Sequence, residues 1–121
     1  MFVEVDDLPD QIQRAWDDLE RRIGSLRGRT FVGTFRDGRY RASTVIRDGD
    51  DPAALQLEIG TIAGGRYARR RLRGDPDALY ADIPAAMEEL ALAASIDASR
   101  PCLEWYRRLD EVDLLVPILG A

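Results

Sequence analysis

The sequence predicts an α+β domain in which two strand–helix–strand–strand repeats, related by a pseudo-two-fold, form an antiparallel sheet with a central cleft. The helices are expected to pack on one face of that sheet. Two observations predict this class. Segments with helical periodicity alternate with short extended segments, in the same order in both halves of the chain. One constant shift in numbering also aligns the halves without a gap, so that Leu19 meets Leu90 in the helix and Phe35 meets Tyr106 in the hairpin.

The first repeat, about residues 1–50, opens with an extended Phe-Val-Glu-Val segment and continues into an amphipathic helix. Asp7 is a suitable N-cap, and Pro9 fits the first helical turn, where its missing N–H is not needed. Apolar residues then recur at helical spacing, and Gly24 or Gly28 is expected to end the helix.

A β-hairpin follows, with strands expected at residues 30–35 and 40–47. Asp37-Gly38 between them is the strongest short signal for a two-residue turn, because both residue types tolerate the left-handed backbone that such a turn requires. The polar stretch 48–52 after the hairpin is the expected boundary between the repeats.

The second repeat, about residues 54–119, follows the same order. A helix start is predicted at Asp75, which can cap it. Pro84 inside the periodic stretch leaves two alternatives: a kinked helix, or a short first turn before a helix that begins near Pro84. Extended segments are expected at four places: 55–62, 66–73, 100–106 and 112–118.

Length and composition favour a single domain over residues 1–121 and exclude several kinds of chemistry. The chain has no histidine and one cysteine, so Ser/His or Cys/His catalysis, a multi-cysteine metal site and an intramolecular disulfide are excluded. We therefore expect no metal and no cofactor. The net charge of −5 disfavours direct nucleic-acid binding, and neither a signal-peptide pattern nor a membrane-spanning apolar run is present. We expect a cytoplasmic protein, a monomer or homodimer, with no membrane partner.

Four short motifs along the chain resemble one known family. Pro101–Tyr106 is similar to a Pro-x-x-Glu-x-Tyr strand, and Val112–Ile118 to the Val-Glu-Leu-x-Ile-Pro strand that follows it. Ile62–Ala68 resembles a Gly-x-Tyr-Ala strand, and Tyr40–Val45 a Tyr-x-Ala-x-Val strand. In this order and spacing the motifs resemble GyrI-like small-molecule-binding domains, the effector-binding domains of multidrug-responsive regulators.

The resemblance implies a small-molecule-binding fold. Some relatives follow DNA-binding domains in regulators that bind lipophilic cations; others stand alone as gyrase inhibitors or as hydrolases of cyclopropane-bearing genotoxins. We expect a stand-alone form here, because the chain has no room for a helix-turn-helix domain. The family's central acid corresponds to Glu104, while Tyr106, Asp113 and Leu115 correspond to positions that face the same cleft. Asp113 departs from the family, which usually has Glu there.

Alternation along the strands predicts which side chains share a face. The large apolar side chains of the closing hairpin are expected to pack on the helices: Leu103, Trp105, Leu114, Val116 and Ile118. The opposite face is expected to carry Cys102, Glu104, Tyr106, Asp113 and Leu115. With the matching aromatic positions of the first half, the candidate ligand-binding residues are Glu104, Tyr106, Asp113, Leu115, Phe31, Phe35, Tyr40 and Trp16. An aromatic-walled cleft with one carboxylate suits a flat cation, because ring faces attract cations and a desolvated acid gains from an opposite charge.

Three functions stay open. The first is binding of hydrophobic, cationic small molecules without catalysis, and it is our choice. The second is a hydrolase of strained genotoxic electrophiles, in which Glu104 activates water; no second strong catalytic group is evident. The third is a protein-binding inhibitor, such as of DNA gyrase, which would use the acidic surface. Whether the chain is an enzyme is left open.

Each candidate also has a purely structural interpretation. Glu104 and Asp113 fit solvated strand residues if their face of the sheet is wet, and Trp16 fits a core position. The arginine run at residues 69–73 fits a solvated edge strand that its charge protects from pairing.

Overall fold

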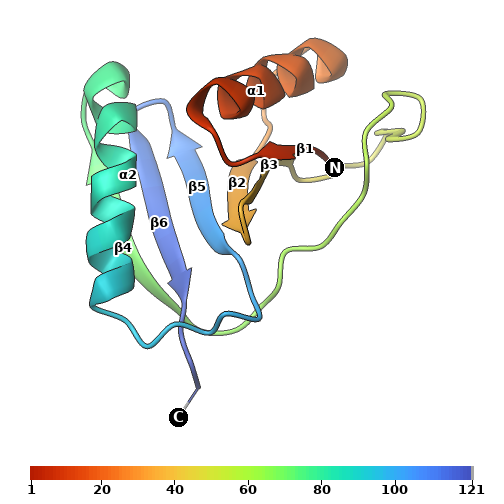
Figure 1. Ribbon diagram of the computed structural model, residues 1–121. Helices are drawn as coiled ribbons and strands as arrows, with labels where there is room; N and C mark the ends of the chain where they lie inside the picture. The colour runs from red at the N-terminus through yellow and green to blue at the C-terminus, as the bar shows by residue number, and fades with distance from the viewer. Residues whose placement is uncertain (121) are drawn as a thin grey trace. The chain divides into compact units, whose positions relative to one another are not determined.

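In the computed structural model, which describes residues 1–120, the chain folds into two compact units (Figure 1). The first unit is Met1–Ile62, and the second begins at Ala63. Each unit contains one helix and three strands that pair in antiparallel fashion. The predicted α+β class and the antiparallel pairing are therefore confirmed.

The first unit is a three-stranded sheet with a helix on one face. Its elements are β1 (Phe2–Asp6), α1 (Pro9–Ile23), β2 (Phe31–Arg36) and β3 (Arg39–Thr44). β3 lies between β1 and β2. Ala15 and Leu19 on the buried side of α1 belong to one core cluster with Tyr40 and Ala42 of β3. Removal of these side chains from water holds the helix on the sheet.

The ends of α1 agree with the prediction except at the cap. Pro9 occupies the first turn, as expected. Gly24 follows the last turn with a positive φ of 76°, and its N–H donates to Glu20 O at 3.0 Å. The predicted cap at Asp7 is wrong, because Leu8 holds the N-cap position and no side chain caps the helix.

The β2–β3 hairpin turns through Asp37 and Gly38, as predicted. Their φ angles are 52° and 75°. Positive φ at both positions is typical of the two-residue turns whose twist matches that of paired strands. The turn fixes the register in which Phe35 lies opposite Tyr40.

The second unit has the same element order. Its elements are β4 (Tyr67–Arg73), α2 (Pro76–Leu92), β5 (Cys102–Arg108) and β6 (Glu111–Pro117), and β6 lies between β4 and β5. The predicted cap is confirmed, since an Asp75 carboxylate oxygen accepts a hydrogen bond from the Asp77 N–H at 3.1 Å. The helix begins at Pro76 and includes Pro84, so the alternative start near Pro84 is wrong.

A β-bulge in β5 sets the register of the closing hairpin. The pairing of Arg108 with Glu111 is followed by that of Tyr106 with Val112, which leaves Arg107 as an extra residue in the ladder. In a regular ladder, each residue of β5 up to Tyr106 would face the next residue along β6 instead. The bulge therefore decides which β6 side chains share a face with those of β5.

The segment between β3 and β4 differs most from its prediction. Residues 55–62, expected to be extended, begin at the end of a turn and then form no strand, with a single bridge between Phe2 and Glu58. Leu57 is buried and belongs to the core cluster of the first unit. Because this segment returns to the first unit, the units divide after it rather than in the polar stretch 48–52.

The two units agree in topology, but no single shift in numbering aligns all their elements. In each unit the first strand pairs with the third, and the second and third strands form a hairpin. The shift found in the sequence matches Phe31 with Cys102, the first residues of β2 and β5. It would also match Pro9 with Tyr80, whereas α2 begins earlier, at Pro76. The shift thus applies to β2 and β5 but not to β3 and β6, where the bulge makes it one residue larger, and the repeat itself stays a prediction.

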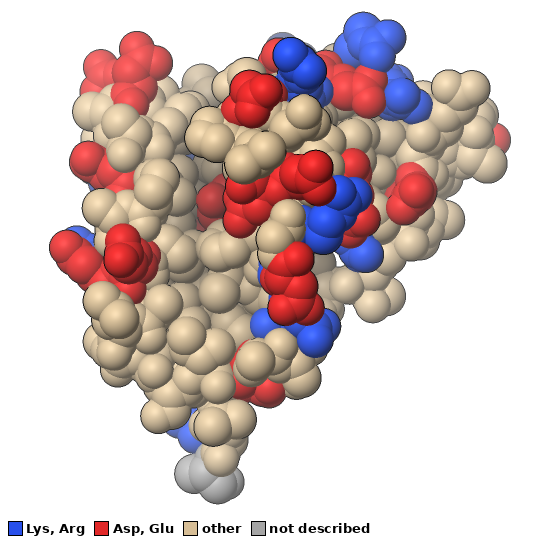
Figure 2. Space-filling view, viewed as in Figure 1, with Lys and Arg blue, Asp and Glu red and all other residues tan. Residues whose placement is uncertain are grey.

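Charge is distributed differently over the two helices. α1 contains both acidic and basic residues, whereas α2 contains Asp77, Asp82, Glu88 and Glu89 and no basic residue. Figure 2 shows red side chains over α2 and a mixture of red and blue over α1. Neither helix that the structure describes is long and apolar enough to cross a membrane.

Candidate functional site

The central predicted acid, Glu104, is half-buried in β5. Its partner across the ladder is Leu114, which is fully buried. The Tyr106 hydroxyl donates a hydrogen bond to Glu104 Oε1 at 2.8 Å. Residues two apart on a strand point to the same face, so the strand itself brings these two side chains together. The result is a carboxylate whose position a neighbouring phenol helps to fix.

α2 adds a second aromatic ring to this pair. Tyr80 packs edge-on against Tyr106, with ring centroids 6.0 Å apart and an interplanar angle of 82°. The Tyr80 hydroxyl also donates to Leu109 O at 3.5 Å. Contact between the two rings shows that Glu104 and Tyr106 face the helix. Tyr80, Glu104 and Tyr106 are called the Glu104 cluster below.

The predicted aromatic residues of the first unit gather on its helix-covered face. Trp16 of α1 donates from Nε1 to the Tyr40 hydroxyl oxygen at 3.0 Å. The Trp16 ring meets Phe31 and Tyr40 edge-on, with centroid distances of 6.1 and 6.4 Å. Phe35 lies opposite Tyr40 and packs against the same core. Trp16, Phe31, Phe35 and Tyr40 are called the Trp16 cluster below.

The structure corrects the predicted face of the site. Sequence alternation places Glu104 and Tyr106 away from the helices, but both lie on the helix-covered face of the second unit. The prediction takes Leu103 and Trp105 as the core-facing pair because they are large and apolar. Trp105 instead lies on the other face, where the Arg107 guanidinium stacks over its ring at 5.0 Å.

Asp113 and Leu115 are separated from Glu104. They lie on the face of β6 away from α2, opposite Trp105 and Leu103 respectively. The bulge causes this separation, because it shifts the pairing of β5 with β6 by one residue relative to a regular ladder. The prediction that these residues share the face of Glu104 is therefore wrong.

Asp113 takes part in an ion-pair network. Its side chain is fully buried (0% exposed), and it accepts hydrogen bonds from Arg71 Nε at 2.7 Å, Arg71 Nη2 at 3.2 Å and Arg107 Nε at 2.9 Å. Arg71 first, and Arg107 in addition, lower the pKa of the Asp113 carboxyl against the opposing effect of burial. An ionised Asp113 thus holds arginines of β4 and β5 over β6.

Sequence reasoning missed Tyr80 and Arg107. Tyr80 follows the buried Leu79, so it borders the apolar side of its helix, and this position was the available signal. Arg107 gave no signal, because its stacking on Trp105 and its bond to Asp113 depend on the bulge.

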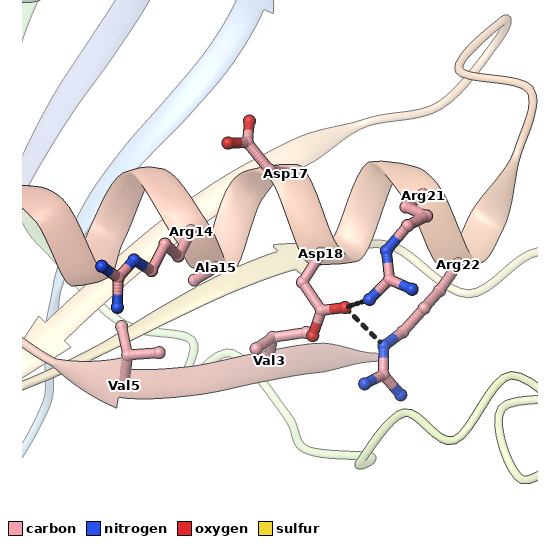
Figure 3. A pocket seen from close by; sticks show the side chains of 8 residues that line it. All are labelled: Val3, Val5, Arg14, Ala15, Asp17, Asp18, Arg21 and Arg22. Carbon is pink, nitrogen blue, oxygen red and sulfur yellow. Dashed lines mark hydrogen bonds and ion pairs between the residues drawn. The ribbon is translucent and has the colours of Figure 1, made fainter.

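The hollow drawn in Figure 3 is a separate feature of the first unit. A groove of about 510 Å³ lies between α1 and β1, with charged side chains of α1 along its rim. Its floor consists of Val3, Val5 and Ala15. Asp18 on the rim is ion-paired with Arg21 and Arg22, so much of the charge there is already matched. No predicted site residue lines this groove.

Two further tests bear on the site. Among residues 1–120, no three Cys, Asp or Glu side chains are grouped so as to hold a metal ion. Comparisons with protein-family models, with curated proteins and with solved structures gave no match. The function must therefore be inferred from the chemistry of the side chains.

Proposed function

We propose that this protein binds lipophilic cations, with Glu104 as the counter-charge. The observation that carries the proposal is the Glu104 cluster, a half-buried carboxylate that is hydrogen-bonded to one tyrosine whose ring contacts another. A carboxylate partly removed from water attracts a cation more strongly than one at the surface. An aromatic face beside it adds about 0.5–2 kcal/mol for a cation held over the ring.

The surroundings of Glu104 favour a large organic cation over a small hydrated one. The Tyr106 hydroxyl, a neutral donor, orients the carboxylate. The exposed Tyr80 ring on α2 supplies apolar surface. A strongly hydrated ion would lose its water shell against such surface without compensation, whereas an aromatic or alkylated cation would not.

The GyrI-like resemblance, the repeat and the cleft belong to the same proposal and rest on the sequence motifs. The Trp16 cluster is a second aromatic group that we include as a candidate contact for the ligand. Asp113 and Leu115 are left out, because they lie on the opposite face from Glu104. The contacts of the Glu104 cluster and the Trp16 cluster give no specific support to the hydrolase or the inhibitor alternative.

Calorimetric titration with methyltriphenylphosphonium tests the proposal, with triphenylphosphine oxide as the neutral analogue. The wild type is expected to bind the cation at least about 10-fold more tightly than the neutral compound, or about 1.4 kcal/mol. Glu104→Gln should remove this preference while keeping shape and hydrogen bonding. Glu88→Gln, at an exposed acid of α2, removes the same charge elsewhere in the unit and should keep the preference.

Equal affinity of the wild type and Glu104→Gln for the phosphonium ion would overturn the proposal. Trp16→Leu tests the Trp16 cluster separately. Weaker binding of both compounds in this variant would identify the Trp16 cluster as a ligand contact, and unchanged binding would exclude it. Tyr106→Phe keeps the ring and should weaken cation binding less than Glu104→Gln.

A further inference from the structure

The outer edge of β4 offers a row of unpaired backbone groups. Among the described residues, β4 pairs with β6 alone. The Ile118 N–H donates to Arg66 O at 3.0 Å, and the Gly74 N–H donates to Asp110 O at 3.1 Å, so the even-numbered positions bond to β6. Antiparallel ladders alternate, and the N–H and C=O groups of the odd-numbered residues therefore point outward. These residues are Tyr67, Arg69, Arg71 and Arg73.

Three arginines share one face of this edge. Arg69, Arg71 and Arg73 lie on the face away from α2, in the row of residues that pair with Leu115, Asp113 and Glu111. On the helix-covered face Ala68 and Leu72 are half-buried, and Arg70 between them is ion-paired with Glu89 of α2. A strand added to this edge would therefore place one set of alternate side chains beside the three arginines and the other set beside two apolar residues and the paired Arg70.

Positive charge is in excess beside this edge. Arg71 shares the Asp113 carboxylate with Arg107, and Arg73 is paired with Glu111. Arg69 is exposed and makes no ion pair within residues 1–120. The edge is thus basic, although the whole chain carries a net charge of −5.

We propose that the outer edge of β4 docks an extended acidic peptide segment of a partner protein, which adds as a further strand. Main-chain hydrogen bonds would supply affinity, and the arginines would select the sequence. A second copy of β4 is disfavoured at this edge, because antiparallel self-pairing would bring arginines against arginines. Acidic residues in alternate positions complement the arginine row, and small apolar residues between them fit beside Ala68 and Leu72. This proposal is independent of cation binding at Glu104.

A fluorescein-labelled peptide with four alternating Glu-Val pairs is the probe, and fluorescence anisotropy at physiological salt is the measurement. Two control peptides are used. In the first, Lys replaces Glu in the alternating sequence; in the second, the four Glu residues are grouped together and followed by the four Val residues. The alternating acidic peptide is expected to bind at least about 10-fold more tightly than either control, because only it matches both charge and alternation. No binding of this peptide would overturn the proposal and leave the arginines as protection of the edge against pairing.

Two variants at Arg69 separate backbone pairing from charge. Arg69→Thr and Arg69→Pro remove the same charge, but only Pro removes the outward N–H, and the bonds to β6 are untouched. Arg69→Pro should weaken binding about 10-fold more than Arg69→Thr. Arg14→Thr in α1 removes the same charge in the other unit and should have little effect. Equal binding by the Pro and Thr variants would show general electrostatic attraction and overturn strand addition.

Amide chemical shifts of the wild type provide a test that needs no variant. The peptide should shift the N–H signals of the outward residues of β4 more than those of Ala68, Arg70 and Leu72. Equal shifts along the strand would contradict the proposed pairing. Sedimentation that shows a dimer, dissociated by Arg69→Pro, would identify a second copy as the occupant and overturn the peptide partner.

Discussion

In the first unit an aromatic side chain of the helix packs with three aromatic side chains of the sheet, whereas in the second unit the helix lies over a carboxylate. In the Trp16 cluster, Tyr40 is 1% exposed and its hydroxyl accepts a hydrogen bond from Trp16, while the other three rings are half-buried against the core. In the Glu104 cluster, Glu104 and Tyr106 are half-buried and Tyr80 is 43% exposed. One strand–helix–strand–strand topology thus places either an aromatic group centred on a buried phenol or a half-buried carboxylate between helix and sheet.

Removal of the Asp113 carboxylate is expected to destabilise the second unit more than any other single change considered for either unit. Asp113→Ala leaves Arg71 and Arg107 without their shared carboxylate, and we expect the free energy of unfolding to fall by about 2–3 kcal/mol. The value is below that for a wholly buried pair, because Arg71 and Arg107 remain partly solvated. Urea denaturation measures the change. Asp110→Ala, in the exposed turn, is the control, and an equal loss in both variants would contradict the role of the network.

Removal of a phenol hydroxyl from each cluster compares the two units directly. Tyr40→Phe should lower the free energy of unfolding by about 1–2 kcal/mol, because the hydroxyl is buried and bonded to Trp16. Tyr106→Phe should cost about 0.5–1 kcal/mol, because Glu104 is half-buried and water replaces part of the lost bond. Thermal and urea unfolding of both variants give the values. A larger loss for Tyr106→Phe would show that the second cluster is the more closed one.

The turn of the β2–β3 hairpin depends on a glycine, whereas the turn of the β5–β6 hairpin does not. Gly38→Ala should cost about 1 kcal/mol, because its φ of 75° is strained for any residue with a Cβ. Gly64→Ala in the second unit is the matched control, since a Cβ there meets nothing within 4 Å and no positive φ is required. The β5–β6 turn has no such glycine, and its register depends on the bulge instead. Equal stability of the two variants would contradict this account of the first turn.

The smallest expected effect is the acid response of the second unit at Asp97. The Ser99 hydroxyl and N–H, together with Arg100 Nε, lower the pKa of the Asp97 carboxyl to about 2. Because the folded-state pKa lies below its usual value, the stabilisation is present above pH of about 4 and is lost as the pH falls toward about 2. The melting temperature of the wild type should therefore be higher than that of Asp97→Asn at pH 6. The difference between the two melting temperatures should disappear as the pH is lowered. A difference in melting temperature that stays constant from pH 6 to 2 would be inconsistent with a lowered pKa of Asp97 in the folded protein.

Local signals in the sequence predicted the secondary structure well where they act over a few residues. The turn at Asp37-Gly38, the cap at Asp75 and the end of α1 at Gly24 depend on backbone conformation and near hydrogen bonds, and all three are confirmed. The extended segment at 55–62 is wrong, because the chain still turns at Leu55 and Gln56 and then meets the first strand only at a single bridge, between Phe2 and Glu58.

The candidate site was predicted in part. The pairing of Glu104 with Tyr106 follows from strand alternation alone, and the structure shows it as a hydrogen bond. The placement of Asp113 on the same face failed, because a bulge adds one residue and its position cannot be read from alternation. Trp105 misled the choice of face, since a large apolar ring also packs under an arginine on the face of the sheet away from the helix.

The bulge at Arg107 has a consequence for how this strand tolerates changes in length. Deleting Arg107 would restore a regular ladder and keep Glu104 opposite Leu114, with the loss of one donor to Asp113. Deleting Trp105 instead would put Glu104 and Tyr106 next to each other in the chain and turn them to opposite sides of the sheet. Evolutionary gain or loss of single residues in β5 should therefore be confined to the bulge, while the spacing between Glu104 and Tyr106 stays fixed.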